Sequence, residues 1–127
     1  MNLFLIPLLS LFVSLVLKSI IDNNSKRRNI MKYGGMPSMH ATFVSSICLI
    51  IALELGISSP LFAVTLTFSL IVISDSLALR RVIGAQSKIL NREHQTQLPE
   101  EMGHRNHEVI AGILLGLLNT YVLNLFF

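Results

Sequence analysis

Apolar residues in this sequence come in long blocks, and polar residues are concentrated between them. Four blocks are long enough to cross a bilayer: they run from about residue 3 to 21, 38 to 55, 61 to 79 and 109 to 127. A helix of roughly 17 to 20 residues measures roughly 26 to 30 Å, which matches the hydrocarbon layer of about 30 Å. The pattern therefore predicts an all-α integral membrane protein in which about four transmembrane helices form a bundle.

Two longer polar segments separate these blocks. Residues 22–36 are basic and contain Gly34 and Gly35, a flexible backbone that can approach a ligand closely. In residues 80–93 apolar side chains recur at helical spacing and basic side chains lie largely away from them, which predicts an amphipathic helix on the membrane surface. Residues 94–103 follow as a predicted loop. With no repeat and no low-complexity tract, residues 1–127 are expected to form a single membrane-embedded domain.

Composition and charge add a prediction of sidedness. The chain is 13% charged, whereas soluble domains are about a quarter charged. All ten lysine and arginine residues lie at the end of the first block, in residues 22–36 or in residues 80–107, so the positive-inside rule places both polar segments in the cytoplasm and both termini outside. The expected location is a bacterial or organellar inner membrane. No basic helix or aromatic platform stands free of the membrane, so nucleic-acid binding is not expected.

The stretch GGMPSMHA at the start of the second block is the first candidate for chemistry. Pro37 suits the first turn of a helix, Ser38 can cap it, and the free N–H groups of that turn are a ready site for phosphate. His40 lies in the same turn and can donate or accept a proton there. A capped helix with a histidine at the interface explains this stretch alone about equally well.

The second candidate, GHRNHEVIAG, lies at the entry to the fourth block. His104 and Glu108 are four residues apart, so they share one face of a helix. The carboxylate can fix the imidazole tautomer and leave the other nitrogen free to attack. Taken alone, the motif is better explained as polar residues in a wet interfacial loop. His107 lies around the helix from His104.

Three cations and one carboxylate complete the candidates. Lys18 ends the first block, where lysines commonly reach the interface without a function, and Arg80 and Arg81 end the third block, where topology signals often lie. An arginine fork nevertheless matches phosphate oxygens well. Asp75 lies about one turn inside the third block, where a carboxylate costs up to about 2.5–3.5 kcal/mol, so it is expected to have a partner. Its preferred role is to orient an arginine or histidine, and a proton relay is the alternative.

The candidates share one location in the predicted topology, the cytoplasmic ends of four different helices. They are Lys18, Ser38, His40, Asp75, Arg80, Arg81, His104 and Glu108. Two histidines, several cations and a helix N-terminus at one place predict a phosphate site with a nucleophile and an acid. Ionisable residues clustered at one end, away from the mid-plane, disfavour a small transporter or proton-conducting protein.

Three stretches in order, GGMPSMHA, SDSLALRRVIGAQSKILN and EMGHRNHEVIAGILLG, resemble the small divergent branch of the type 2 phosphatidic acid phosphatase superfamily. That branch is described as acid phosphatase/vanadium-dependent haloperoxidase-related. The resemblance covers nearly the whole chain. It implies a helical fold and a metal-independent phosphatase that forms a phosphohistidine and needs no cofactor.

The resemblance also implies roles for individual residues. The superfamily motif Pro-Ser-Gly-His corresponds to residues 37–40, with Met39 in place of glycine, so that Ser38 would bind phosphate and His40 would act as general acid. Pro37 and Gly35 would support this turn.

The superfamily's third motif, Ser-Arg followed by His and by Asp four residues later, places the nucleophile at His104 and the orienting carboxylate at Glu108. Arg80 or Arg81 would bind phosphate, although Arg81 is over twenty residues from His104, much farther than in the parent motif. Lys18 corresponds to the lysine of the first motif.

The expected function is therefore a lipid-phosphate phosphatase at the cytoplasmic face, with phosphatidic acid or phosphatidylglycerol phosphate as substrate and the lipid bilayer as its surroundings. One alternative is a non-catalytic member that binds lipid phosphates or acts as a scaffold, with a homodimer formed through Gly112 and Gly116. Packing of these glycines within the monomer's own bundle is the preferred interpretation. A zinc site of His40, His104 and His107 does not have the spacing of a known site, so no metal is expected.

Overall fold

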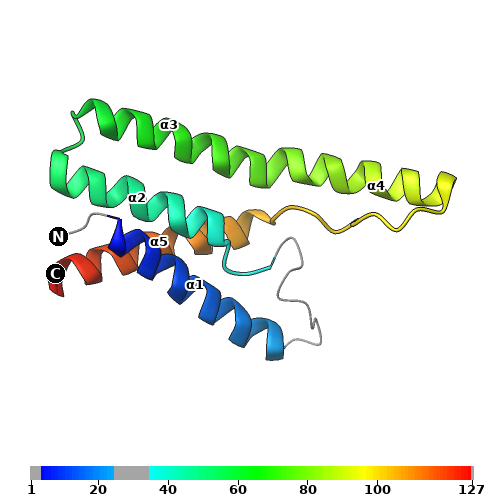
Figure 1. Ribbon diagram of the computed structural model, residues 1–127, viewed down its shortest axis with the longest axis horizontal. Coiled ribbons are helices and arrows are strands. Elements are labelled where there is room, and N and C mark those ends of the chain that lie inside the picture. Colours follow the sequence, from blue (N-terminus) through cyan, green and yellow to red (C-terminus); the bar gives the residue numbers. More distant parts are fainter. Residues whose placement is uncertain (1–3, 25–34, 127) are drawn as a thin grey trace.

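The computed structural model describes residues 4–24 and 35–126, and all regular secondary structure in them is helical (Figure 1). The elements are α1 (Leu5–Asn24), α2 (Met39–Leu55), α3 (Pro60–Ser74), a π-helical turn η1 (Asp75–Leu79), α4 (Arg80–His94) and α5 (Asn106–Phe126). Each of the four apolar blocks falls on a helix, which confirms the predicted all-α class. Most of the basic 22–36 segment, including Gly34, lies outside the described residues.

Serine side chains begin two of the helices. Ser38 is the N-cap of α2, and its Oγ accepts a hydrogen bond from the Ala41 N–H at 3.4 Å. Ser59 caps α3 in the same way, with Pro60 in the first turn. Such caps satisfy N–H groups that have no partner within the helix. The predicted place of Pro37 is corrected by one step, because the proline precedes the N-cap and is buried before α2 begins.

The elements α3, η1 and α4 form one continuous helix, Pro60–His94, of 35 residues. Figure 1 shows it as a long rod whose α4 end projects beyond α2. The predicted amphipathic helix exists as α4, which continues along the direction of α3, and its location on a membrane surface stays a prediction. The predicted loop is confirmed, and it returns along α4, where Gly84 leaves room for the Glu100 carbonyl oxygen.

The centre of the bundle is α2, which packs against α1, α3 and α5, while α1 also packs against α5. The contact between α2 and α5 is close because Gly112 faces the Ser38 carbonyl and Gly116 faces Thr42 and Ser45. A side chain at either glycine would collide with the α2 backbone. This confirms that the two glycines pack within the monomer. In contrast, α3 and α5 do not pack closely against each other.

Polar groups fill much of the interior, and apolar side chains point outward. The buried polar residues include Ser10 and Ser14 of α1, Thr42 and Ser46 of α2, and Thr120 of α5. Two helices, Pro60–His94 and Asn106–Phe126, are long and apolar enough to cross a membrane, and little of their apolar surface is buried within the protein. The apolar helices Leu5–Ile21 and Met39–Leu55 are shorter. Small and hydroxylated residues between helices are typical of membrane bundles.

Candidate functional site

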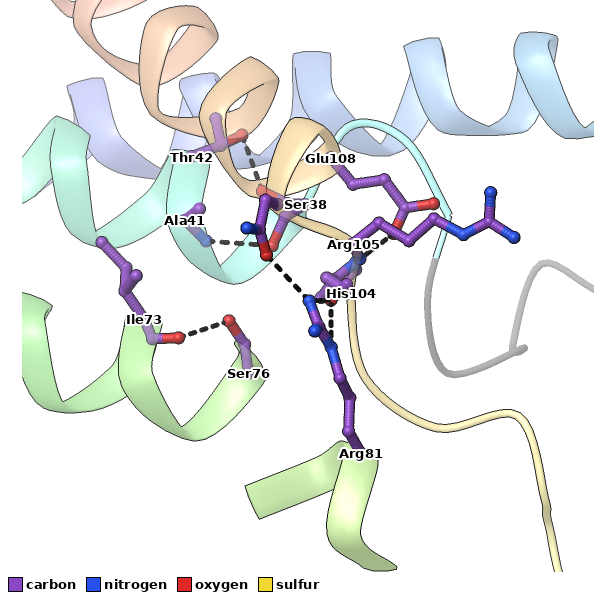
Figure 2. Close-up of polar contacts among 10 residues, drawn as sticks. Ser38, Ala41, Thr42, Ile73, Ser76, Arg81, His104, Arg105 and Glu108 are labelled. Carbon is purple, nitrogen blue, oxygen red and sulfur yellow. Dashed lines mark hydrogen bonds and ion pairs between the residues drawn. The ribbon is translucent and has the colours of Figure 1, made fainter. Parts of the chain in front are cut away.

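His104 and Glu108 lie together as predicted, but they do not share a helix face, because His104 precedes α5 and Glu108 lies in its first turn. The Nδ1 atom of His104 lies 3.3 Å from Oε2 of Glu108. The same carboxylate oxygen accepts a hydrogen bond from the Arg105 N–H at 2.9 Å, so its position is fixed by the backbone that it caps (Figure 2). With Nδ1 directed at the carboxylate, Nε2 is the imidazole nitrogen for chemistry.

His104 is nearly buried, with 5% of its surface exposed. Burial is the largest influence on the imidazole and lowers the pKa of His104 below its ordinary value of 6.5. The Glu108 carboxylate and the Gly35 backbone raise this pKa, and the positive charge of Lys18 lowers it, but burial prevails. The imidazole is therefore neutral at pH 7, which is the form that a nucleophile requires.

The start of α2 is joined directly to the start of α5. The Ser38 N–H donates to the Glu108 carbonyl oxygen at 3.0 Å, and the Ser38 carbonyl accepts from both the N–H and Oγ1 of Thr42, each at 3.0 Å. Ser38 itself is fully buried, whereas His40, two residues later, is exposed. The cap is thus part of the framework, and His40 is the accessible polar group of this turn.

Ionisable side chains from other parts of the bundle act electrostatically on the imidazole of His40. These side chains are Arg80, His104, Lys18 and Asp75. Nε of Arg80 lies 3.1 Å from Oδ2 of Asp75, and both side chains are partly exposed. This pair fits the expected role of Asp75 in orienting an arginine. Lys18 is 3% exposed, so its aliphatic chain is enclosed within the bundle.

The sequence belongs to a recognised family over almost its full length. Residues 1–119 match the divergent PAP2 family. The chain belongs to this family. A curated relative, described as the uncharacterized membrane protein YuiD of Bacillus subtilis (strain 168), is 36% identical over 115 residues, covering 74% of this chain and 73% of the relative. No solved structure matches the chain. The predicted resemblance is confirmed.

In this divergent PAP2 protein the two neighbouring arginines have different surroundings. Nε and Nη2 of Arg81 donate to the His104 carbonyl oxygen at 3.2 and 2.9 Å, and Nη2 also donates to Oδ1 of Asn106 at 2.9 Å (Figure 2). Arg81 therefore holds the backbone that carries His104, whereas Arg80 pairs with Asp75 and its charge acts on the imidazole of His40. Sequence alone left these two residues as alternatives.

The π-helical turn explains how the long helix reaches the His104 segment. The carbonyl oxygen of Ser76, within η1, accepts the His104 N–H at 3.1 Å. Gly103 has a φ of 88°, which strains any residue with a side chain, and a Cβ there would lie only 3.2 Å from Ser76 and Arg81. π-Turns widen a helix locally and often mark functional sites. Ser76, Gly103 and Asn106 were not predicted, because a π-turn and a backbone acceptor leave no motif in the sequence.

The structure thus brings the predicted residues together from every helix of the bundle. Those near one another are Lys18, Ser38, His40, Asp75, Arg80, His104 and Glu108, with Gly35 and Pro37 at the entry to α2. Arg81 lies beside this cluster and is engaged with backbone. Among the described residues, no group of three or more His, Cys, Asp or Glu side chains is arranged to hold a metal ion.

Proposed function

We propose that this protein is a lipid-phosphate phosphatase that hydrolyses a phosphomonoester through a phosphohistidine. The observation that carries the proposal is the buried His104–Glu108 pair beside a second histidine and a group of cations. Membership of the divergent PAP2 family supports a phosphatase-type chemistry. The residues for a nucleophile, an acid and an electrostatic clamp all come from the same end of the bundle.

The chain crosses the membrane four times in this proposal, with the site at the cytoplasmic face and both termini outside. The outward-facing apolar side chains and the description of the relative as a membrane protein support the membrane location. The basic residues near the site support its sidedness. Phosphatidic acid and phosphatidylglycerol phosphate, which carry a phosphomonoester, fit a cytoplasmic site.

In the first step, Nε2 of His104 attacks phosphorus while the bond from phosphorus to the ester oxygen breaks. Protonated His40 gives its proton to the departing alcohol oxygen. Lys18 and Arg80 offset the charge that is spread over the phosphoryl oxygens, and such preorganised charge is commonly the largest contribution to catalysis. The Ser38 hydroxyl accepts from the Ala41 N–H and is fully buried, so its role is to hold the first turn of α2, and the predicted contact between Ser38 and phosphate is corrected.

In the second step, neutral His40 takes a proton from a water molecule as the water oxygen attacks the phosphohistidine. The bond between phosphorus and Nε2 breaks, so inorganic phosphate is released and His104 returns to its neutral form. Glu108 stabilises the positive charge that His104 acquires in each transition state and keeps its ring in one orientation.

The test is release of inorganic phosphate by the purified protein in detergent, with EDTA present and phosphatidic acid or phosphatidylglycerol phosphate as substrate. We expect wild-type protein to release phosphate and His104→Ala to release essentially none. His107→Ala is the matched control, because His107 is exposed and lies outside the cluster. Brief incubation with phosphorus-labelled substrate should also give an acid-labile protein adduct in wild type and His107→Ala but not in His104→Ala.

Three outcomes would contradict the proposal in different ways. No release from either lipid by a folded wild-type protein would favour binding without turnover. Equal release by wild type and His104→Ala would remove His104 as the nucleophile. Loss of activity in EDTA alone would point to a metal-dependent reaction.

A further inference from the structure

An apolar groove of about 320 Å³ lies between α2, α3 and α5, outside the cluster of charged residues. Its floor includes Ser45, Cys48 and Ala52 of α2, and its walls include Ile73 of α3 and Ile113 of α5. The groove exists because α5 lies close to α2 through its glycines, while α3 and α5 do not pack closely together. Its volume falls at the lower end of the range of ligand pockets, roughly 300–1,000 Å³.

The groove offers almost no polar group to an occupant, although two serines line it. Ser45 Oγ donates to the Thr42 carbonyl at 3.1 Å, and Ser69 Oγ donates to the Thr65 carbonyl at 2.7 Å, with the Val44 carbonyl also within 3.2 Å. Both hydroxyls are thus directed at the backbone of the helices. A sugar, a nucleotide or an ion would find no partners here, whereas a hydrocarbon chain would lose none.

The groove begins near the charged cluster and extends away from it along α2 and α3. Along α2 it extends from Ser45 to Ala52, which begins about 7 Å and ends about 18 Å below His40 at a rise of about 1.5 Å per residue. On the long helix its upper end is Ile73, whose carbonyl oxygen accepts from Ser76 at the start of the site. The groove therefore runs along the helices away from the cluster, as an acyl chain runs away from its headgroup.

We propose that this groove binds one hydrocarbon chain of the lipid whose phosphate group binds at His40, Arg80 and His104. The inference rests on the proposed function only for the binding of a lipid phosphate, and not for its hydrolysis. It names the substrate class as phosphomonoesters with a long chain, and water-soluble phosphate esters are poor ligands. The depth of the groove below His40 leaves room for the polar link between phosphate and chain.

Cys48 gives a direct test because it lines the groove and is the single cysteine of the chain. The experiment measures the rate at which a membrane-permeable maleimide modifies Cys48 in detergent, with and without hexadecylphosphonate. This phosphonate is not hydrolysed, because it has a carbon–phosphorus bond. At a concentration about ten times its dissociation constant we expect about a tenfold slower reaction, since protection follows the occupied fraction. Ethylphosphonate and hexadecanol should protect much less.

A matched control places the thiol elsewhere on the same bundle. In Cys48→Ser/Val64→Cys the cysteine lies on an exposed face of α3, outside the groove lining, and should show no protection. Ala52→Phe fills the groove in an otherwise unchanged protein. It should weaken binding of hexadecylphosphonate by about tenfold in a calorimetric titration, which corresponds to about 1.4 kcal/mol, and leave ethylphosphonate unchanged. This second measurement does not depend on thiol reactivity.

Equal protection by hexadecanol would mean that the groove accepts any lipid chain and would overturn the link to phosphate. Protection that rises with protein concentration and without added ligand would assign the groove to a second copy of the chain. Unchanged hexadecylphosphonate binding in Ala52→Phe would also overturn the inference. Protection by hexadecylphosphonate in a protein that releases no phosphate would contradict hydrolysis alone. Phosphate release with neither protection nor chain-length preference would contradict the groove alone.

Discussion

The two faces of α2 that contact α5 and α3 are built differently. Toward α5, Gly112 and Gly116 bring the helix backbones into contact, and the Ser38 N–H is bonded to the Glu108 carbonyl. Toward α3 the packing leaves an apolar groove, and within α3 only Ser69 is buried. The α5 face of α2 is therefore packed too closely to admit a ligand, whereas the α3 face borders the groove of about 320 Å³.

This difference assigns different tasks to the two halves of the site. The α5 face of α2 fixes the position of His104 and Glu108 along the helix axis relative to Ser38. If α5 slid along α2, a residue with a side chain would replace a glycine at the contact and collide with the α2 backbone. The α3 face borders the long helix that carries Asp75 and Arg80, whose side chains are partly exposed. We infer that the groups that react are held rigidly and that the groups that receive substrate have room to adjust.

The largest effect is expected from closing the glycine contact. In Gly116→Leu the new side chain meets Ser45 Oγ and the Thr42 carbonyl, so α5 must move away from α2. Overpacking of this kind typically costs about 1–3 kcal/mol, and we expect about 3 kcal/mol or more because the obstacle is backbone. Unfolding by sodium dodecyl sulfate, followed by circular dichroism, measures the change.

The control for this variant is Leu114→Phe on the same helix. Leu114 is 62% exposed, so a larger side chain there meets no neighbouring helix. If Gly116→Leu and Leu114→Phe unfolded at the same detergent fraction, the close contact would not be what holds α5 to α2.

A large effect on catalysis is expected at the rigid half of the site. Glu108→Gln preserves the shape but removes the charge beside His104, and we expect kcat to fall by about 10²-fold or more. The Glu108 carboxylate raises the pKa of His104, so its loss lowers that pKa further. The acidic limb of the pH profile of kcat/KM should therefore move to lower pH. Glu101→Gln, an exposed change, should alter neither. An acidic limb that moved upward would contradict the assignment of His104 as the group titrated.

Arg80 and Arg81 are adjacent in sequence but belong to different halves of the site, so substituting each in turn tests the two halves separately. Arg80→Gln removes a charge at the receiving half and should lower kcat/KM by about 10²-fold with little change in stability. Arg81→Gln removes the bonds to the His104 carbonyl and should lower the free energy of unfolding by about 1 kcal/mol, with a smaller loss of activity. Phosphate release and detergent unfolding are measured for both. Identical profiles for the two variants would contradict the separate roles.

Sequence reasoning predicted the helices and the grouping of the polar residues, because both depend on local patterns. Runs of apolar residues predict where the helices lie, and a serine at the N-terminal start of such a run predicts the cap found at Ser38. The contact of His104 with Glu108 was predicted from a shared helix face; the contact is present, although His104 precedes the helix. These features depend on residues close together in the chain.

Features that depend on distant contacts could not be predicted. The long helix passes from α3 into α4 through the π-turn η1, where the Ser76 carbonyl receives the His104 N–H, and such a backbone acceptor has no sequence signature. Which of Arg80 and Arg81 is directed at the His104 segment depends on how far the helix turns through η1. A signal was present for the polar interior, since Ser10, Ser14 and Lys18 recur every four residues in α1. It defines a face that is buried in the structure.

The smallest effect is expected from single hydroxyls in the interior, and it tests whether polar contacts or close backbone packing hold the helices together. Among the described residues, Ser14 Oγ is buried without a hydrogen-bond partner, whereas Ser46 Oγ is bonded to Oγ1 of Thr120 across the α2–α5 contact. Removal of an unpaired hydroxyl costs little, so Ser14→Ala should change the free energy of unfolding by less than about 0.5 kcal/mol or increase it. Ser46→Ala should cost about 0.6 kcal/mol, the average for such bonds in membrane bundles, and no more than about 1.7 kcal/mol. Detergent unfolding of both variants gives the difference, and a Ser46→Ala cost near that of Gly116→Leu would mean that hydrogen bonds, more than the glycine contact, distinguish the α5 face of α2 from the α3 face.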